Sequence, residues 1–293
     1  MTSFSRRDFL KASAATSALA GLGTLPLEAE SQTAASWVPL GNSGVKITRL
    51  AFGTGTMSGA VQRNLGQEGF NRLVRYAYDR GIRFFETSDS YYDMHRMLGI
   101  ALQDIPRENY RLMTKVTTDD PTPPLQKIDE LRRQARTDYF DILLLHWQHT
   151  STWPEDTRPW QEAVLVAQHR GSVRARGASV HGLPALARVP DNSWLQIGMI
   201  RVNHKGVRMD TEDYMASVGG DVPEVVTRIH QTLASGKGVI SMKLIGEGTF
   251  DRDDRRRAMR FAFRTARVDS VTVGYKSNAE IDEAIENLDA ALA

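Results

Sequence analysis

Strand-like apolar runs alternate with helical periods along most of this chain, and this alternation limits the folds that it can adopt. Between the runs, apolar residues recur three or four positions apart, as at Leu125, Ile128 and Leu131. Such alternation predicts parallel strands with helices packed outside them. Eight strands favour an α/β fold that closes as a (β/α)8 barrel, a TIM barrel, over an open sheet. The expected strands are 47–53, 82–87, 110–116, 140–146, 172–179, 195–203, 237–243 and 269–274.

The first 35 residues differ from the rest and predict an export signal. Residues 5–11, SRRDFLK, place two arginines before Phe-Leu and a lysine, and a mildly apolar stretch follows at 12–25. This pattern is typical of a twin-arginine signal, so we expect the twin-arginine translocation machinery to export the folded protein to the periplasm. A membrane span needs about 20 apolar residues, so we expect no stable membrane anchor. We assign 1–35 to the signal peptide and linker, with cleavage after Ala29 or Ala35, and 36–293 to the barrel.

The composition excludes several kinds of site. The chain has no cysteine, which excludes disulfides, thiolate metal sites, cysteine-bound iron–sulfur clusters and a lipid anchor. The formal net charge of +2 gives no reason to expect a nucleic-acid partner. A small molecule is the expected partner, and a monomer is favoured.

Four reactive side chains follow one another at the ends of apolar runs. They are Glu86 and Tyr91 in FFETSDSYY, Lys115 in YRLMTKV, and His146 in YFDILLLHW. The strand ends of a barrel meet at one mouth, where barrel enzymes carry their chemistry. A phenol has a pKa near ~10, so a neighbouring ammonium is needed to make its proton available at neutral pH. We therefore expect Tyr91 to protonate a carbonyl oxygen, with Lys115 beside it and His146 orienting the substrate.

Around these residues the sequence resembles the aldo-keto reductase family. The family pattern after its second strand is similar to G-x-R-x-F-D-T-A-x-x-Y, and the later segments also match in order. Residues 38–57 resemble the family's N-terminal hairpin and first strand, and the resemblance covers nearly all of the chain after residue 35. The matching residues are Gly81, Arg83, Phe85, Thr87, Tyr91, Leu98, Gly99, Ala101, Leu102, Lys115, Asp138, Tyr139, Asp141 and His146.

The resemblance implies hydride transfer from NADP(H), with NAD(H) as another possible cofactor, to a small aldehyde or ketone. It also implies that the carboxylate at position 86 pairs with Lys115. The family has aspartate there, and the longer Glu86 is expected to fold back or displace the lysine, in a site where about 1 Å can matter. The residues expected to bind the cofactor are Gly53, Thr54, Ser179, Lys243, Ile245, Gly246, Lys276 and Ser277.

The start of the last helix carries a further phosphate signal. Ser277 and Glu280 form a capping-box pattern, and a helix N-terminus beside Lys276 can bind an anion. In the family this region holds the adenosine phosphate of NADPH, often with an arginine further along. Glu280 and Asp282 stand in that neighbourhood here, which predicts a weak grip on the 2′-phosphate.

Two other functions fit parts of the sequence. An exported barrel that binds a ligand without redox turnover is favoured by Glu86 and by Val180, which replaces a family asparagine. A metal-dependent hydrolase would use the histidines near the expected strand ends, although the first strand lacks the paired histidines usual in such enzymes, and we assign no metal ligand. These histidines are His149, His181 and His204, which could join Glu86 and His146.

Overall fold

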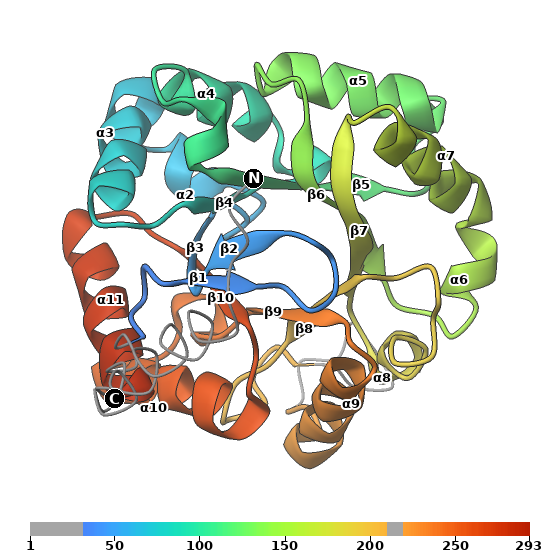
Figure 1. Cartoon of the computed structure of the whole chain (residues 1–293). Helices are drawn as coiled ribbons and strands as arrows, with labels where there is room; N and C mark the ends of the chain where they lie inside the picture. Colours follow the sequence, from blue (N-terminus) through green and yellow to red (C-terminus); the bar gives the residue numbers. More distant parts are fainter. Residues whose placement is uncertain (1–31, 210–218) are drawn as a thin grey trace, which may run out of the picture. The chain divides into compact units, whose positions relative to one another are not determined.

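The computed structural model describes residues 32–209 and 219–293, which form a closed barrel of eight parallel strands. The strands follow the order β10-β3-β4-β5-β6-β7-β8-β9, and β9 pairs in turn with β10. Figure 1 shows the helices forming a ring outside the strands. The predicted (β/α)8 barrel is therefore confirmed. The strand bounds are β3 Leu50–Gly53, β4 Phe84–Glu86, β5 Arg111–Thr117, β6 Phe140–Gln148, β7 Val173–Val180, β8 Ile197–Arg201, β9 Gly238–Met242 and β10 Ser270–Gly274.

The first expected strand, 47–53, is two strands, and this prediction was wrong. β2 (Lys46–Thr48) pairs antiparallel with β1 (Trp37–Pro39), and the barrel strand β3 begins only at Leu50. At the break, the Thr48 hydroxyl donates to the carbonyl oxygen of Leu50 over 2.8 Å. This local bond offers the backbone an alternative to a continuous ladder. The apolar run hides the break because both strands are largely buried.

The β1–β2 hairpin closes one end of the barrel. Its side chains Val38, Leu40, Val45 and Ile47 belong to the same buried cluster as the side chains of the lumen. The hairpin turn also bridges to Lys237, directly before β9, so it lies at the amino ends of the strands. The predicted N-terminal hairpin is therefore present, and the opposite end, where the strands finish, is the mouth.

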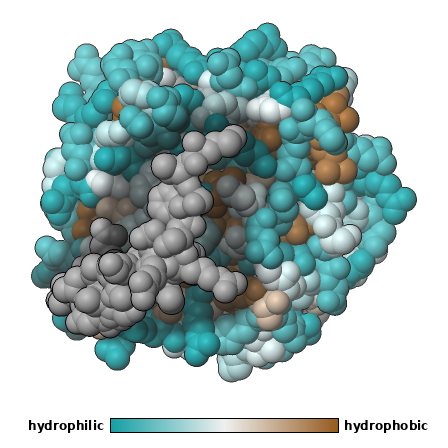
Figure 2. Space-filling model, in the orientation of Figure 1, coloured by the Kyte–Doolittle hydropathy of each residue, from teal (hydrophilic) through white to brown (hydrophobic). Residues whose placement is uncertain are grey.

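The segments between strands form helices that bury one face against the barrel. The expected apolar faces are found: Ile128 and Leu131 of α5, and Val225 and Ile229 of α9, are buried. On the side shown in Figure 2, the ring of helices is mainly hydrophilic. The helix bounds are α2 Ala60–Arg63, α3 Gly66–Asp79, α4 Met94–Leu102, α5 Pro124–Gln134, α6 Trp153–Asp156, α7 Arg158–His169, α8 Leu183–Leu186, α9 Val222–Ala234, α10 Arg252–Phe261 and α11 Asn278–Leu292.

The last residues of the segment assigned to the signal peptide and linker pack on the barrel. Ala34 is 2% exposed, and its backbone N–H donates to the Asp289 carboxylate over 2.6 Å. Most of the segment 1–35 lies outside the described residues, so its boundary stays a prediction. Cleavage after Ala29 would keep the Ala34 contact, whereas cleavage after Ala35 would remove it. In the described part of the chain, no helix is long and apolar enough to cross a membrane.

A buried histidine in the outer layer links folding to pH. His95 of α4 is fully buried, with Nε2 lying 2.7 Å from the Thr114 hydroxyl oxygen. Burial, with a smaller effect from Lys127, lowers the pKa of His95 to about 3. The folded protein therefore holds this imidazole neutral at pH values where the unfolded chain, with a pKa near 6.5, binds a proton. Its contribution to stability is complete above pH 6.5 and is lost as the pH falls towards 3.

We expect His95→Gln to reduce the acid sensitivity of the fold. Between pH 7 and pH 5 the wild type should lose about 2 kcal/mol more free energy of unfolding than the variant, because only its unfolded state gains this proton. Urea unfolding at the two pH values measures the difference. Asp269, whose pKa burial raises to about 6, acts in the opposite direction but is common to both proteins. Identical pH dependence in the two proteins would contradict the prediction.

Candidate active site

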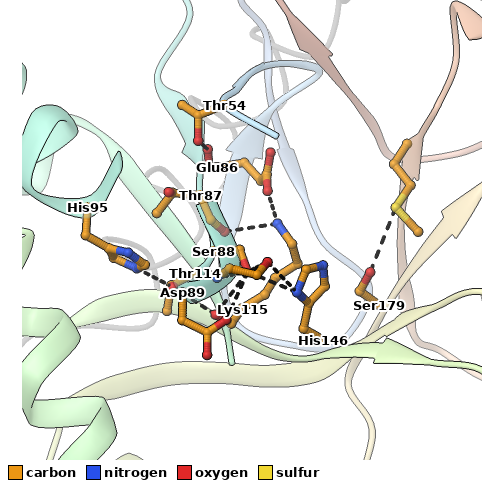
Figure 3. A network of polar contacts seen from close by, with 12 residues as sticks. Thr54, Glu86, Thr87, Ser88, Asp89, His95, Thr114, Lys115, His146 and Ser179 are labelled. Atoms are coloured by element: carbon orange, nitrogen blue, oxygen red, sulfur yellow. Dashed lines mark hydrogen bonds and ion pairs between the residues drawn. The ribbon is translucent and has the colours of Figure 1, made fainter. Parts of the chain in front are cut away.

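Three neighbouring strands carry the expected reactive side chains to the mouth. Side chains alternate between the two faces of a strand, so every second residue points into the lumen. Glu86 of β4, Lys115 of β5 and His146 of β6 each stand two positions after a residue of the lumen cluster. Figure 3 shows the three side chains lying together. The lumen residues that precede them are Phe84, Met113 and Leu144.

Glu86 and Lys115 form a buried ion pair. The Lys115 ammonium contacts Glu86 Oε1 and donates to the carbonyl oxygen of Thr87 over 2.9 Å. Burial lowers the pKa of Lys115, with Lys243 adding to the effect, while the carboxylate favours the charged ammonium. A Cβ on Gly53 would lie 3.2 Å from Glu86 Oε2 and 2.6 Å from Thr272 Cγ2. The bare backbone at Gly53 therefore makes room for the longer glutamate, which reaches the lysine directly.

Tyr91 lies beside this pair, at the end of the short 3-10 helix η1 (Asp89–Tyr91). The Lys115 ammonium nitrogen is 4.7 Å from the centroid of the Tyr91 ring. A Cβ on Gly55 would lie 2.5 Å from the phenol oxygen, so the ring packs against bare backbone. Burial raises the pKa of Tyr91, and Asp89 and Glu247 add to the rise. The sequence led us to expect a lysine-lowered pKa; the lysine is adjacent, but the shift has the opposite direction.

His146 completes the group. Its ring meets the Tyr91 ring edge to face, with centroids 5.9 Å apart. Its Nδ1 lies 3.0 Å from the Ser88 hydroxyl oxygen. Burial lowers the pKa of His146 well below its ordinary value, and Lys115 and Lys243 lower it further. The imidazole is therefore neutral at neutral pH and carries a single N–H.

The sequence analysis missed the residues that support this group. Asp89 accepts hydrogen bonds from the backbone N–H and the hydroxyl of Thr117, at 2.8 and 2.7 Å. This anchors η1 to the end of β5, while Ser88 and Ser90 contact His146. The stretch TSDS between Glu86 and Tyr91 could have predicted this support, because Ser and Asp beside a strand end commonly form hydrogen bonds to nearby backbone.

The other histidines do not join the group as a metal site would require. His149 Nδ1 lies 3.0 Å from the carbonyl oxygen of Trp147, and His204 Nε2 lies 3.4 Å from the Asp254 carboxylate. His181 is the neighbour of His146, with ring centroids 6.0 Å apart. Within residues 32–209 and 219–293 there is no group of three or more His, Cys, Asp or Glu side chains placed to hold a metal ion.

The expected cofactor residues follow strands around the same mouth. Ser179 of β7 is fully buried, with its hydroxyl oxygen 3.2 Å from His181 Nε2. Lys243 follows β9 in a left-handed conformation and pairs with Glu247. Gly246 lies where a Cβ would be 2.6 Å from the Thr249 hydroxyl oxygen. The others are Gly53 and Thr54 after β3, Ile245 beside Gly246, and Lys276 and Ser277 after β10.

The N-terminus of α11 already holds a carboxylate. Ser277 caps the helix by accepting the Glu280 N–H over 3.3 Å, as the capping-box pattern predicts. The Glu280 carboxylate, however, accepts from the backbone N–H of Lys276 over 2.8 Å and lies 3.8 Å from its ammonium. The N–H and the ammonium of Lys276 could bind an anion, but the negatively charged Glu280 carboxylate already contacts both. The Glu280 carboxylate therefore already engages the donors of Lys276 that an added phosphate would use.

Comparison with known families decides the assignment of the chain. The model of the aldo/keto reductase family matches residues 49–290. The chain belongs to the aldo/keto reductase family. Membership supports an oxidoreductase of the carbonyl-reducing kind. A second model, for twin-arginine signal sequences, matches residues 3–23, so this aldo/keto reductase is exported by the twin-arginine pathway, which usually leads to the periplasm.

Individual relatives of this aldo/keto reductase are distant. It is 30% identical to an Arabidopsis thaliana L-galactose dehydrogenase over 167 residues, covering 52% of this chain and 51% of that protein. It is 20% identical to a Bacillus subtilis aldo-keto reductase over 236 residues, covering 75% of this chain and 68% of that one. The chain spans only 38% of the length of a matched relative from Glycine max.

Solved structures of other aldo-keto reductases share the fold. A holo structure from Bacillus halodurans matches with a TM-score of 0.68 at 16% identity, covering 88% of this chain and 95% of that one. A Bombyx mori structure in complex with NADP matches with a TM-score of 0.63 at 17% identity, covering 88% and 92%. These likenesses establish the barrel; substrate and cofactor have to be argued from this chain's own residues.

Proposed function

We propose that this aldo/keto reductase is an NADP(H)-dependent oxidoreductase that reduces a small aldehyde or ketone, with NAD(H) as an alternative cofactor. The observation that supports it is the meeting of Tyr91, the Lys115–Glu86 pair and His146 at one end of the lumen. A phenol, an ammonium and a neutral imidazole around one space suit a carbonyl oxygen that gains negative charge as it is reduced.

Each side chain of the group has a separate role in the proposed reduction. When bound, the nicotinamide supplies the hydride that reduces the carbonyl carbon. The raised pKa of Tyr91 keeps its phenol protonated at neutral pH, so that it can donate this proton to the carbonyl oxygen. The Lys115 ammonium lies close enough to stabilise the phenolate that forms, and Glu86 holds that ammonium in place. A hydrogen bond from His146 orients the carbonyl.

The nucleotide would extend from these side chains along the mouth. Ser179, in the lumen wall, is proposed to bind the carboxamide end. Lys243, Ile245 and Gly246 after β9, with Gly53 and Thr54 after β3, are proposed to line the path of the pyrophosphate. Lys276 and Ser277 are proposed to meet the adenosine phosphate, where the Glu280 carboxylate competes with it.

We expect Glu280→Gln to change the choice of cofactor. Removing the negative charge releases the Lys276 ammonium for the 2′-phosphate, while the glutamine amide oxygen can still accept the Lys276 N–H. A charge-assisted hydrogen bond is worth about 1.5–3 kcal/mol. NADPH should therefore bind roughly 10-fold or more tightly to the variant, while NADH affinity changes little. Fluorescence titration of the purified protein with both nucleotides measures the two dissociation constants.

Glu286→Gln is the matched control. It removes the same charge from an exposed position on the same helix, away from its N-terminus. Equal tightening of NADPH by both variants would assign the effect to net charge and not to the anion site. Absence of binding of either nucleotide at millimolar concentration, in wild type and variants, would refute the reductase proposal as a whole.

A ligand-binding barrel without redox turnover is the second candidate, and it is favoured by the self-occupied helix N-terminus and by Val180 beside Ser179. The two differ in what the exported protein contains. A reductase that travels folded is expected to carry its nucleotide with it. We therefore expect periplasmic protein, purified without added nucleotide and then denatured, to release near-stoichiometric NADP or NAD. An empty protein with a melting shift for a non-nucleotide ligand would favour the binding function.

A further inference from the structure

Two serine hydroxyls converge on one ring nitrogen of His146. Ser88 Oγ lies 3.0 Å and Ser90 Oγ lies 3.2 Å from Nδ1, and the two hydroxyl oxygens are 3.1 Å apart. In the described part of the chain they are the two hydrogen-bond partners of this nitrogen. Figure 3 shows Ser88 and His146 facing each other beside Lys115. A neutral imidazole has one N–H. If a hydroxyl donates to Nδ1, the ring proton is on Nε2, which can then act as a donor; if Nδ1 carries the proton, Nε2 can only accept.

The hydrogen bonds around Ser88 indicate the direction of donation. A serine hydroxyl has one donor and two acceptor positions. Ser88 Oγ accepts the backbone N–H of Ser90 over 3.4 Å and can also accept the Ser90 hydroxyl. Its own hydrogen can go to Nδ1 at 3.0 Å, to Asp89 Oδ1 at 3.2 Å or to the carbonyl oxygen of Lys115 at 3.5 Å, and Nδ1 is the nearest of the three. Asp89 Oδ1 already accepts the shorter bond from Thr117. Donation to Nδ1 thus fills every position on Ser88 and aligns the two hydroxyls in one chain, which strengthens both bonds.

The serines also sit on the element that carries the phenol. Ser88 caps η1, which ends at Tyr91, and Asp89 ties the same turn to β5. A displacement of this turn would therefore move the phenol and the partners of His146 together. The acid on η1 and the orienting histidine on β6 therefore share one support.

We propose that Ser88 and Ser90 are positioning residues: Ser90 donates to the Ser88 hydroxyl, and Ser88 donates to Nδ1 of His146, which places the ring proton on Nε2, the nitrogen left to donate to the substrate carbonyl. The catalytic meaning of this arrangement rests on the proposed function, whereas the tautomer itself does not. The family pattern has alanine at position 88, so the device belongs to this chain's own sequence.

The test is a direct reading of the tautomer. Purified protein with 15N-labelled histidine gives long-range proton–nitrogen spectra that distinguish an Nε2–H from an Nδ1–H ring. The His146 signals are identified by their loss in His146→Gln. We expect Nε2–H in the wild type and a shift of about tenfold in the tautomer ratio towards Nδ1–H in the Ser88→Ala/Ser90→Ala double variant, the equivalent of one hydrogen bond. Ser90→Thr keeps the hydroxyl and should keep the wild-type signals.

The buried His95 provides an internal control. It contacts Thr114, away from the serines, so its unchanged signals show that the double variant is folded. An Nδ1–H tautomer in the wild type, or an unchanged tautomer in a folded double variant, overturns the proposal. A wild type that shows the serine-dependent Nε2–H but reduces no carbonyl compound supports the positioning role and refutes the reductase function instead. If the enzyme is active, the double variant should lose kcat while its affinity for the nucleotide is retained.

Discussion

Replacing Tyr91 with phenylalanine is expected to lower the rate of carbonyl reduction by roughly 100- to 10,000-fold, the range usual for removal of a general acid. The substitution deletes one oxygen from a ring that packs against Gly55 and lies 4.7 Å from the Lys115 ammonium, so the fold and the nucleotide site should be preserved. Steady-state kinetics with an aldehyde substrate and a parallel nucleotide titration separate the loss of kcat from any loss of binding.

Tyr92→Phe is the matched control for this experiment. Tyr92 is the next residue, undergoes the same chemical change and is 71% exposed, so its hydroxyl is not held in the lumen. Its loss should leave the rate nearly unchanged. Comparable turnover by the Tyr91 and Tyr92 variants would remove Tyr91 from the mechanism.

Replacing Lys115 with methionine is expected to cost about 3–5 kcal/mol in free energy of unfolding at neutral pH, because it leaves the Glu86 carboxylate buried without its partner. Both side chains are almost completely inaccessible: Lys115 is 0% and Glu86 is 2% exposed. Urea unfolding at pH 7 measures the loss. The stability should recover in part as the pH falls, because protonation removes the buried charge.

The double variant Lys115→Met/Glu86→Gln isolates the cause. It removes both charges at nearly constant volume, so that no unpaired charge is left buried. We therefore expect the double variant to be more stable than Lys115→Met alone but equally inactive. If the two variants unfold alike, the lost energy comes from packing and not from an unpaired carboxylate.

Much of this fold could be predicted because it depends on periodicity. The alternation of strands and helices gave the barrel, and alternation within each strand brings Glu86, Lys115 and His146 to one face. The break at Arg49 could not be predicted, since the apolar pattern runs through it and only a local Thr48 bond marks it. Such a bond depends on backbone conformation, which composition does not determine.

The details of the site depend on contacts between distant segments. The direction of the Tyr91 pKa shift follows from burial by the surrounding loops, which outweighs the neighbouring lysine. The room for Glu86 comes from Gly53, 33 positions earlier in the sequence. Ser277 caps the last helix as the motif predicts, but the Glu280 carboxylate accepts from the N–H of Lys276, one residue before the cap. Sequence spacing places these residues at the mouth but does not fix their distances.

The pairing that closes the barrel also sets the order of events during synthesis. β3 and β10 meet along the register from Leu50–Val271 to Gly53–Gly274, so the first strand of the barrel waits for almost the last one. While the ribosome is still translating, β3 is an edge strand with unsatisfied backbone groups, and such an edge is prone to wrong pairing. The arginine pair of the signal leaves the ribosome early, whereas the barrel is closed only when β10 has been synthesised. An interval of cytoplasmic maturation, in which the nascent chain needs protection before β10 pairs with β3, is therefore built into the topology.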